Sequence, residues 1–554
     1  MSEGEFVGKQ KTVVIGLDGA TFTVLKPMME KGYLPNLSNM IKDGVHGPLE
    51  STMPPFSAAA WASFMTGKNP GKHGLFDFRA PVMISPERPL TNATSIRSKT
   101  IWGILSDAGK KVGVINVPMT YPPERVNGFM IGGMVASGME EKCFYPKELY
   151  QETIRAIGEY PPEPDWDWYR ENGTRMASSP VIQRLIGEVS HLSQKRGEAA
   201  LYLMEQFDWD VFMVVFTSVD RLQHFAWKYL DPGHKEYKPE EAEKYLESLA
   251  GYFSGLDKMI GQIVQSAGKE THTIVMSDHG FGPQYKKFYI NNWLAEKGFL
   301  GLLENKRKWR RHLRRFDISR IRRFLPRSID KKIRGNFTVF NCIDWSRTEA
   351  YGGTSSEQGI FINVKGREPY GIVETGRQYE DVVDHVCEEL ERLTDPETGK
   401  QVVNKVFRRD ELYSGPYVDY GPDIVFELKG MSYLTKENIG HHALFESSGF
   451  ESGSHRREGI LIMNGPNCKQ GVECQGASIL DLAPTVLYLS GLPVDKDMDG
   501  SVLTGWLDDK FVERNPIQAQ RLETTFDGDE IRAVYSDSES EEIESMLQGL
   551  GYID

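Results

Sequence analysis

The chain has 554 residues, of which 40 % are hydrophobic and 26 % charged, which is typical of a globular protein and excludes a collagen-like or wholly disordered chain. With 65 Lys and Arg residues against 78 Asp and Glu residues, its formal charge is −13. A protein that coats nucleic acid would need a basic surface, so we expect no sequence-specific nucleic-acid partner.

The N-terminal segment and the cysteines predict a cytoplasmic protein. The first apolar stretch, Val13 to Leu17, is too short for a signal peptide, and no window of about 20 apolar residues could span a membrane. The five cysteines are odd in number and include no Cys-x-x-Cys pair, which argues against a disulfide framework or a zinc ribbon.

Seven short apolar runs predict buried parallel strands, because each is nearly continuous in Val, Ile and Phe and ends in a polar or glycine-rich turn. In chain order they are Thr12–Leu17, Lys111–Val117, Val211–Thr217, Thr273–Met276, Gly359–Val364, Ile424–Leu428 and Gly459–Met463. Helical stretches such as Pro239–Ala267 and Tyr379–Leu393 lie between them. This alternation predicts an α/β fold, with a central, mostly parallel sheet flanked by helices on both faces.

Residues 305–334 interrupt this pattern. The segment contains 14 Lys or Arg residues against Asp317 and Asp330, so it carries +12 of charge and leaves −25 on the other residues. Apolar residues recur in it at helical spacing, at Trp309, Leu313, Phe316 and Phe324. Three interpretations stay open: a solvated helix pair, a cap that attracts anionic substrate, and a surface helix in peripheral contact with an anionic membrane.

The predicted organisation is one large catalytic unit with insertions. Residues 1–300 and 345–510 are expected to form one discontinuous α/β domain, with an accessory lobe at 139–210 and a basic helical insertion at 301–344. Residues 511–554 are expected to be a C-terminal extension. It contains the acidic run Ser536–Ser545, for which we expect a solvated helix.

Carboxylates and imidazoles follow three of the predicted strands. Asp18 follows the first strand, Asp220 and His224 follow the third, and Asp278 and His279 follow the fourth. Ligands of such sheets bind beyond the carboxyl ends of the strands, so we expect these side chains at one edge. The i, i+4 spacing of Asp220 and His224 places both on one helical face. Mixed nitrogen and oxygen ligands without a thiolate suit zinc or manganese.

Ser57 is the candidate nucleophile. Prolines precede it, alanines follow it, and Gly67 ends the helix that this pattern predicts, so we expect Ser57 at the N-cap. An oxygen there lies at the positive end of the helix, where an alkoxide and an anionic substrate are both stabilised. For an isolated serine a plain cap is the commoner interpretation. The carboxylate and imidazole motifs elsewhere in the chain favour catalysis.

Five ordered motifs resemble those of the alkaline phosphatase superfamily: GLDG with Asp18, Ser57 followed by TGKNPGKHG, VDRLQH, SDHGFG, and GSH ending at His455. The resemblance is closest to the type I phosphodiesterase/nucleotide pyrophosphatase branch and the allied phosphohydrolase/phosphomutase proteins. It runs from about residue 12 to about residue 505. It implies an alkaline-phosphatase-like fold with inserted cap elements and a metal-dependent phosphohydrolase.

The same resemblance implies two divalent metal ions, with zinc expected first and manganese as the alternative. One ion would be held by Asp220, His224 and His455, and the other by Asp18, Asp278, His279 and the Ser57 oxygen. Ser57 would take the phosphoryl group as the alcohol leaves, and water would then release the product.

Departures from the family pattern bear on the substrate. In nucleotide pyrophosphatases the nucleophile is usually Thr and an Asn follows the His-Gly motif, whereas this chain has Ser57 and Phe78 at those places. Helix N–H groups or Asn116 would have to replace the missing donor, and Trp61 and Phe281 are further candidate substrate contacts. We expect a phosphodiesterase that acts on a small-molecule or lipid-like phosphate ester.

Other functions use the same features. The metal site would equally serve a phosphomutase, a phosphotransferase or a phosphomonoesterase. A protein without catalysis could bind anions or a membrane surface through the basic insertion at 301–344. No oligomeric state is predicted.

Overall fold

The computed structural model describes residues 10–136, 138–161, 163–171, 179–303, 339–353, 358–439, 443–522 and 534–553. The basic segment predicted at 305–334 lies outside these residues. Within the described ranges, no helix is both long and apolar enough to cross a membrane.

A large sheet forms the centre of the molecule. Its strands are β1 (Lys11–Leu17), β2 (Val45–Glu50), β3 (Val112–Val117), β4 (Gly128–Gly132), β5 (Phe144–Tyr145), β6 (Val211–Phe216), β7 (Thr271–Met276), β17 (Glu458–Asn464), β18 (Val472–Glu473) and β19 (Ala477–Ser478). The order is β18-β2-β17-β7-β1-β6-β3-β4-β5, with β19 also paired to β2. Strands β7, β1, β6, β3 and β4 are parallel. The prediction of an α/β fold with a mostly parallel sheet is therefore confirmed.

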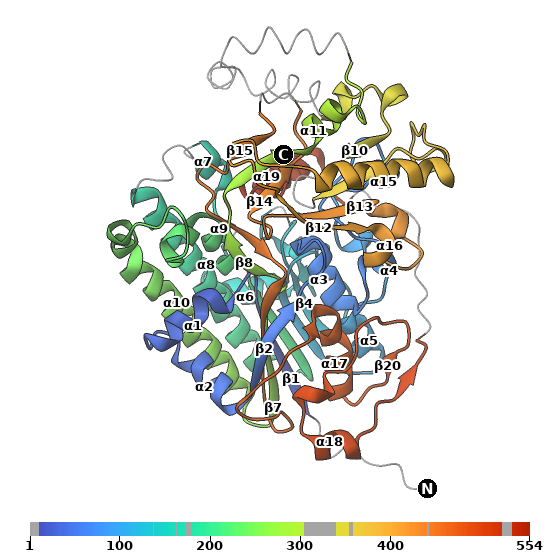
Figure 1. Ribbon diagram of the computed structural model, residues 1–554. Coiled ribbons are helices and arrows are strands. Elements are labelled where there is room, and N and C mark those ends of the chain that lie inside the picture. Colours follow the sequence, from blue (N-terminus) through green and yellow to red (C-terminus); the bar gives the residue numbers. More distant parts are fainter. Residues whose placement is uncertain are drawn as a thin grey trace.

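Helices cover both faces of this sheet (Figure 1). One face carries α1 (Phe22–Glu30), α2 (Pro35–Asp43), α8 (Ser179–Gln206), α9 (Ser218–Leu230) and α10 (Pro239–Ala267), and the other carries α3 (Ser57–Thr66), α5 (Ile101–Asp107) and α17 (Leu482–Leu489). Helix α10 has the predicted bounds. It starts at a proline, has Glu240 and Glu241 in its first turn, and ends before Gly268.

A second core lies beside the central sheet. It contains a four-stranded antiparallel sheet of order β10-β11-β13-β12, packed against α11 and α15. These elements are β10 (Ala350–Gly352), β11 (Gly359–Ile362), β12 (Val403–Arg408), β13 (Ile424–Leu428), α11 (Ile290–Lys297) and α15 (Arg377–Glu391). Smaller sheets are formed by β9 (Lys286–Tyr289), β14 (Tyr433–Lys436) and β15 (Phe445–Ser447), and by β8 (Gly280–Pro283) and β16 (Gly453–Arg456).

Three runs that were predicted as parallel strands are antiparallel. Strand β17 is antiparallel to both β2 and β7, while β11 and β13 belong to the second sheet. That part of the prediction is wrong. A strand buried on both faces has the same continuous apolar sequence in either direction, so periodicity alone does not distinguish the two cases.

The remaining elements are short or lie near the chain ends. They are α4 (Pro70–His73), α6 (Leu149–Ile157), α7 (Trp166–Glu171), α16 (Arg409–Leu412), α18 (Asp509–Arg514), α19 (Asp537–Gly549), β20 (Val494–Asp495) and β21 (Ala519–Gln520). The acidic run of the C-terminal segment does begin a helix, α19. Within this run Ile543 is buried, whereas its other side chains are exposed or half-buried as expected of a solvated helix. Beyond the run, Leu547 and Tyr552 are also buried in the main core. The domain boundaries stay predictions.

Candidate active site

Three neighbouring parallel strands deliver four of the candidate residues. Asp18 directly follows β1, Asp278 and His279 follow β7, and Asp220 lies in the first turn of α9 after β6. An acidic residue in a first helical turn is favoured by the helix dipole. All four side chains are completely buried. The strand-end argument therefore identified residues that share one edge of the sheet.

The other three candidates come from separate elements. His224 lies one turn after Asp220 on α9, and His455 lies on β16 opposite Phe281 of β8. Ser57 is the first residue of α3, and Phe56 holds the N-cap position in an extended conformation. The expected N-cap role of Ser57 is thus wrong by one residue, because the extended approach continues through Phe56.

Asp220, His224 and His455 form a compact triangle of donor atoms. Asp220 Oδ1 lies 3.4 Å from His224 Nε2 and 3.2 Å from His455 Nε2, and the two nitrogens are 3.3 Å apart. A tetrahedral zinc ion with bonds of about 2.0–2.1 Å separates its ligands by about 3.3–3.4 Å. The triangle therefore has the dimensions of a zinc ligand set.

A second group of donor atoms surrounds His279. Its Nε2 lies 3.0 Å from Ser57 Oγ, 3.3 Å from Asp278 Oδ2 and 3.7 Å from Asp18 Oδ1. The rings of His279 and His455 stack with their centroids 3.8 Å apart, so the two groups adjoin. By distance alone, His279 could serve either group.

The three imidazoles are oriented by backbone carbonyls. Their Nδ1 atoms face the oxygen of Gly453 for His224 (3.2 Å), of Gly280 for His279 (3.1 Å) and of Pro55 for His455 (3.1 Å). A carbonyl can only accept a hydrogen bond, so each Nδ1 carries a hydrogen, and in the neutral ring each Nε2 presents a lone pair. All three lone pairs point at the carboxylates.

The carboxylates meet these lone pairs with unsatisfied oxygens. Among the described residues, Asp18 Oδ1, Asp220 Oδ1 and Asp278 Oδ2 are buried without a hydrogen-bond partner. They are the same oxygens that face the imidazole nitrogens. Acceptors that face acceptors in a buried site are unfavourable unless a cation lies between them. The donor chemistry therefore fits bound cations.

The pKa values of the site carboxyl groups and imidazoles also indicate that the site lacks positive charge. Burial and the nearby Asp220 raise the pKa of Asp18 to about 8, and burial together with Asp18 raises the pKa of Asp278 well above its usual range. Burial lowers the pKa of His279 and of His455, so these imidazoles are neutral and do not offset the carboxylate charge.

Two residues that the sequence reasoning missed hold the other oxygen of Asp220. Arg221 Nη1 donates to Asp220 Oδ2 over 2.7 Å, and the hydroxyl of Tyr552 donates to the same atom over 2.8 Å. Arg221 directly follows the predicted ligand Asp220, and this adjacency in the sequence could have indicated that it lies at the site. Tyr552 lies 332 residues further along the chain, and only its apolar neighbours in the sequence indicated burial.

The three predicted substrate contacts have different surroundings. Trp61 donates from Nε1 to Asp18 Oδ2 over 3.4 Å and is completely buried, so it supports a candidate ligand. Phe281 packs edge-on against His224, with ring centroids 4.9 Å apart. Asn116 donates from its amide to the Val215 carbonyl over 2.8 Å, which ties β3 to β6. Their substrate roles stay predictions.

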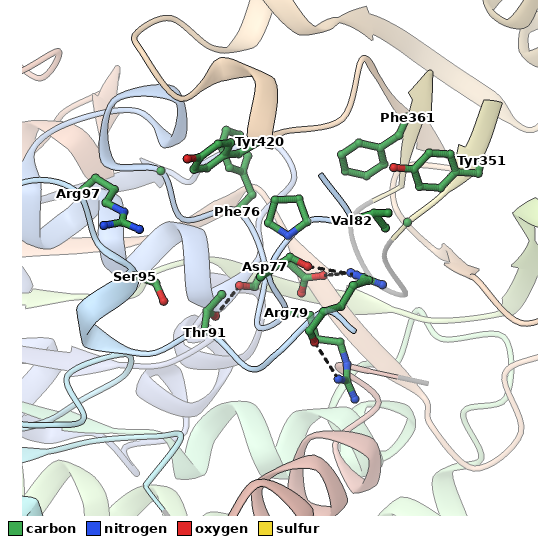
Figure 2. A pocket seen from close by; sticks show the side chains of 15 residues that line it. Phe76, Asp77, Arg79, Val82, Thr91, Ser95, Arg97, Tyr351, Phe361 and Tyr420 are labelled. Carbon is green, nitrogen blue, oxygen red and sulfur yellow. Dashed lines mark hydrogen bonds and ion pairs between the residues drawn. The ribbon is translucent and has the colours of Figure 1, made fainter. Parts of the chain in front are cut away.

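A pocket lies between residues 74–97 and the second core, and none of the candidate metal or nucleophile residues lines it (Figure 2). Its lining combines aromatic rings with charged groups, among them Phe76, Asp77, Arg97, Phe361 and Tyr420. Burial raises the pKa of Asp77 to about 6, against the opposing effect of Arg88, whose guanidinium lies 3.3 Å away. The next residue, Phe78, does not line this pocket and instead stacks on Tyr552, with ring centroids 5.4 Å apart.

Comparisons with known proteins cover most of the chain. The family model for type I phosphodiesterase / nucleotide pyrophosphatase proteins matches residues 12–455, a range that contains all seven candidate metal and nucleophile residues. No curated protein matches the sequence.

Solved structures resemble the chain at low sequence identity. Phosphonoacetate hydrolase from Sinorhizobium meliloti 1021 in complex with phosphonoacetate is 15 % identical, with a TM-score of 0.51, over 87 % of this chain and 96 % of its own. The same enzyme in complex with phosphonoformate gives a TM-score of 0.52. Human ectonucleotide pyrophosphatase / phosphodiesterase 5 is 12 % identical, with a TM-score of 0.48, over 90 % of this chain and 100 % of its own. At such identity, the likeness to phosphonoacetate hydrolase concerns the fold.

Proposed function

The chain belongs to the type I phosphodiesterase / nucleotide pyrophosphatase family, and from this premise we propose that it is a phosphodiesterase with Ser57 as nucleophile and two divalent cations as cofactors. Proteins of this family hydrolyse phosphoric esters, so the prediction of an enzyme is confirmed. Zinc is proposed first and manganese as the alternative. The observation that carries the proposal is the set of unsatisfied carboxylate oxygens that face imidazole lone pairs.

Two donor sets would hold the cations. Asp220, His224 and His455 form one set, and Asp18, Asp278, His279 and Ser57 form the other. When bound, the cations supply positive charge that stabilises the Ser57 alkoxide and the phosphoryl oxygens.

Ser57 is placed for attack by the start of α3. As the first residue of the helix it lies where the leading N–H groups have no intrahelical acceptor, so they are available to an anionic ester. In the proposed reaction Ser57 Oγ bonds to phosphorus as the ester bond to the leaving alcohol breaks. Water then attacks phosphorus, the Ser57 Oγ–P bond breaks, and a monoester product leaves.

Aromatic side chains close the surroundings of the nucleophile. Phe56 precedes Ser57 and packs edge-on against Phe78, with ring centroids 5.1 Å apart, and Phe281 packs against His224. All three rings are buried. A wall of this kind keeps water away from the charged groups, which strengthens their electrostatic interactions.

Replacing the nucleophile tests the proposal. We expect Ser57→Ala to lower turnover of an aryl phosphodiester by about a thousandfold or more, because no oxygen remains to form the intermediate. The matched control is Ser63→Ala, on the same helix, whose hydroxyl lies 3.0 Å from His73 Nε2 and which we expect to retain activity. Full turnover by Ser57→Ala would show that Ser57 is not the nucleophile. Purified protein that is active without bound metal would show that the divalent cations are not cofactors.

Product analysis separates hydrolysis from transfer. The reaction is run in water with and without added alcohol acceptors, on a panel of diesters, monoesters and phosphonates. A phosphodiesterase gives the monoester product at the same rate in both conditions. A mutase or transferase instead gives a new ester with the added alcohol, and a phosphomonoesterase prefers the monoesters.

We further propose a cytoplasmic protein whose substrate is a small-molecule or lipid-like phosphate ester. Its basic segment 305–334 is proposed to contact anionic membrane peripherally, since its charge of +12 contrasts with −25 on the rest of the chain.

A further inference from the structure

The C-terminal segment reaches the centre of the candidate site through one hydroxyl group. Tyr552 OH accepts a hydrogen bond from Arg221 Nη1 over 2.9 Å and donates one to Asp220 Oδ2 over 2.8 Å. Arg221 Nη1 also donates to Asp220 Oδ2, over 2.7 Å. The three groups thus form a closed ring of hydrogen bonds in which Asp220 Oδ2 accepts two.

This ring leaves one oxygen of Asp220 for a cation. Because Oδ2 accepts from both Arg221 and Tyr552, the carboxylate cannot rotate without breaking two buried hydrogen bonds. Its Oδ1 is therefore held toward His224 and His455, at 3.4 and 3.2 Å.

Arg221 is itself fixed from behind. Its Nε donates to Glu163 Oε2 over 3.3 Å, and Glu163 Oε1 pairs with Arg196 Nη2 at 2.6 Å. Arg221 is completely buried, so its partners are fixed within the core. Asp220 and Arg221 both belong to the VDRLQH motif, whereas Tyr552, the third member of this ring of hydrogen bonds, belongs to none of the five motifs.

The ring of Tyr552 is packed among site residues. It stacks on Phe78 with centroids 5.4 Å apart and meets His224 and His455 edge-on at 5.8 and 5.6 Å. Its side chain therefore fills the space between these two imidazoles and Phe78.

Polar contacts fasten the segment that carries Tyr552 to both cores. Glu544 on α19 pairs with Arg79 at 3.1 Å, and the Gly551 carbonyl accepts from Lys436 of β14 over 3.3 Å. Tyr535, which precedes α19, donates its hydroxyl to the Val135 carbonyl over 2.8 Å. The approach of Tyr552 to Asp220 is thus set by contacts along the whole segment.

We propose that Tyr552 is a positioning residue of the candidate metal site, whose hydroxyl orients Asp220 as a ligand. This inference rests on the proposed two-cation site. It assigns to the C-terminal segment a function that the five sequence motifs do not contain.

The test compares Tyr552→Phe with Tyr535→Phe. Both variants remove one hydroxyl from a tyrosine of the same segment, and only the first hydroxyl touches Asp220. Zinc retained per chain is measured by elemental analysis after dialysis against graded chelator concentrations. We expect Tyr552→Phe to bind one of its two zinc ions about 10- to 100-fold more weakly than the unaltered protein, as for other groups that orient metal ligands. Tyr535→Phe should retain both ions as the unaltered protein does.

Three outcomes would overturn the inference. The first is equal zinc retention by Tyr552→Phe and the unaltered protein, and the second is an equal loss in both variants, which would assign the effect to general packing. The third is a Tyr552→Phe protein that does not fold, because phenylalanine fills the same space and the hydroxyl would then serve folding. If the unaltered protein binds two zinc ions but cleaves no phosphodiester, the proposed function fails while this inference stands.

Discussion

At the scale of single residues, the two oxygens of Asp278 have different surroundings. Oδ1 accepts from the Gly19 N–H over 3.2 Å, while Oδ2 lies 3.3 Å from His279 Nε2. An ionised Asp278 therefore favours the binding of a cation and destabilises the folded protein when no cation is bound. Stability and metal binding should therefore respond in opposite directions to its neutralisation.

We predict that, at a pH above the raised pKa of Asp278, where the carboxylate is ionised, Asp278→Asn stabilises the metal-depleted protein by about 1 kcal/mol or more and abolishes the further stabilisation by zinc. The asparagine keeps an acceptor for Gly19 N–H, and its amide can donate to His279 Nε2, so one unsatisfied contact becomes a hydrogen bond. Melting temperatures with and without zinc measure both effects.

Asp257→Asn is the matched control with the opposite expected sign. Asp257 is a buried carboxylate that accepts from the Asn36 and Leu37 N–H groups at the start of α2, at 2.9 Å each. An amide nitrogen placed opposite one of those donors should cost about 1–3 kcal/mol and leave the zinc effect intact. Equal shifts in the two variants would contradict the special role of Asp278.

At the scale of elements, the contact between β1 and α3 positions Asp18. Gly16 of β1 has space for no side chain, since a Cβ there would lie 2.8 Å from both Trp61 on α3 and Val215 on β6. Trp61 in turn donates to Asp18. A glycine two residues before a candidate ligand thus sets the distance between the strand and the nucleophile helix.

We expect Gly16→Ala to destabilise the protein by about 1–3 kcal/mol and to weaken zinc binding, because the methyl group displaces Trp61. Gly251→Ala, in the exposed middle of α10, should instead stabilise by roughly 0.5–1 kcal/mol, because its methyl group points into open space among the described residues. Chemical unfolding and zinc retention measure the pair. Undiminished zinc affinity in Gly16→Ala would contradict the positioning role of this contact.

Sequence patterns predicted four of the five strands in the parallel part of the sheet and missed β4. The runs that became β1, β6 and β7 are followed by motif residues, and local chemistry was enough to place Asp18, Asp220, Asp278 and His279 at one edge. The direction of β17 and the second sheet depend on long-range pairing, which leaves no mark in a continuous apolar run. The Ser57 helix was found with its start displaced by one residue.

The contacts of the candidate ligands that the sequence did not predict join segments that are far apart in the chain. Tyr552 follows an acidic run and belongs to no motif, so its bond to Asp220 could be seen only in three dimensions. Trp61 was predicted near the site as a substrate contact, whereas its indole bonds to a candidate ligand.

At the scale of the whole molecule, charge is distributed unevenly along the chain. The segment 305–334 carries +12, and the rest carries −25. An acidic body repels anionic esters and anionic membranes alike, so a concentrated positive segment is where either would be attracted.

We predict that replacing 305–334 by an uncharged linker abolishes binding to vesicles that contain anionic lipid. The full chain should bind such vesicles at low salt and leave them at high salt, because the attraction is screened. Sedimentation with neutral vesicles is the control, and neither protein should bind these. Salt-sensitive binding that survives the replacement would show that another part of the chain contacts lipid.

The bond between Tyr552 and Asp220 also has a consequence for biosynthesis. A ribosome that adds about 5–20 residues per second needs roughly half a minute to two minutes to reach the end of a chain of this length. Asp18, Ser57 and the other candidate ligands all emerge before Tyr552 does. If Tyr552 orients Asp220 as proposed, a nascent chain binds cations at this site more weakly until residue 552 has been translated and has folded against Asp220.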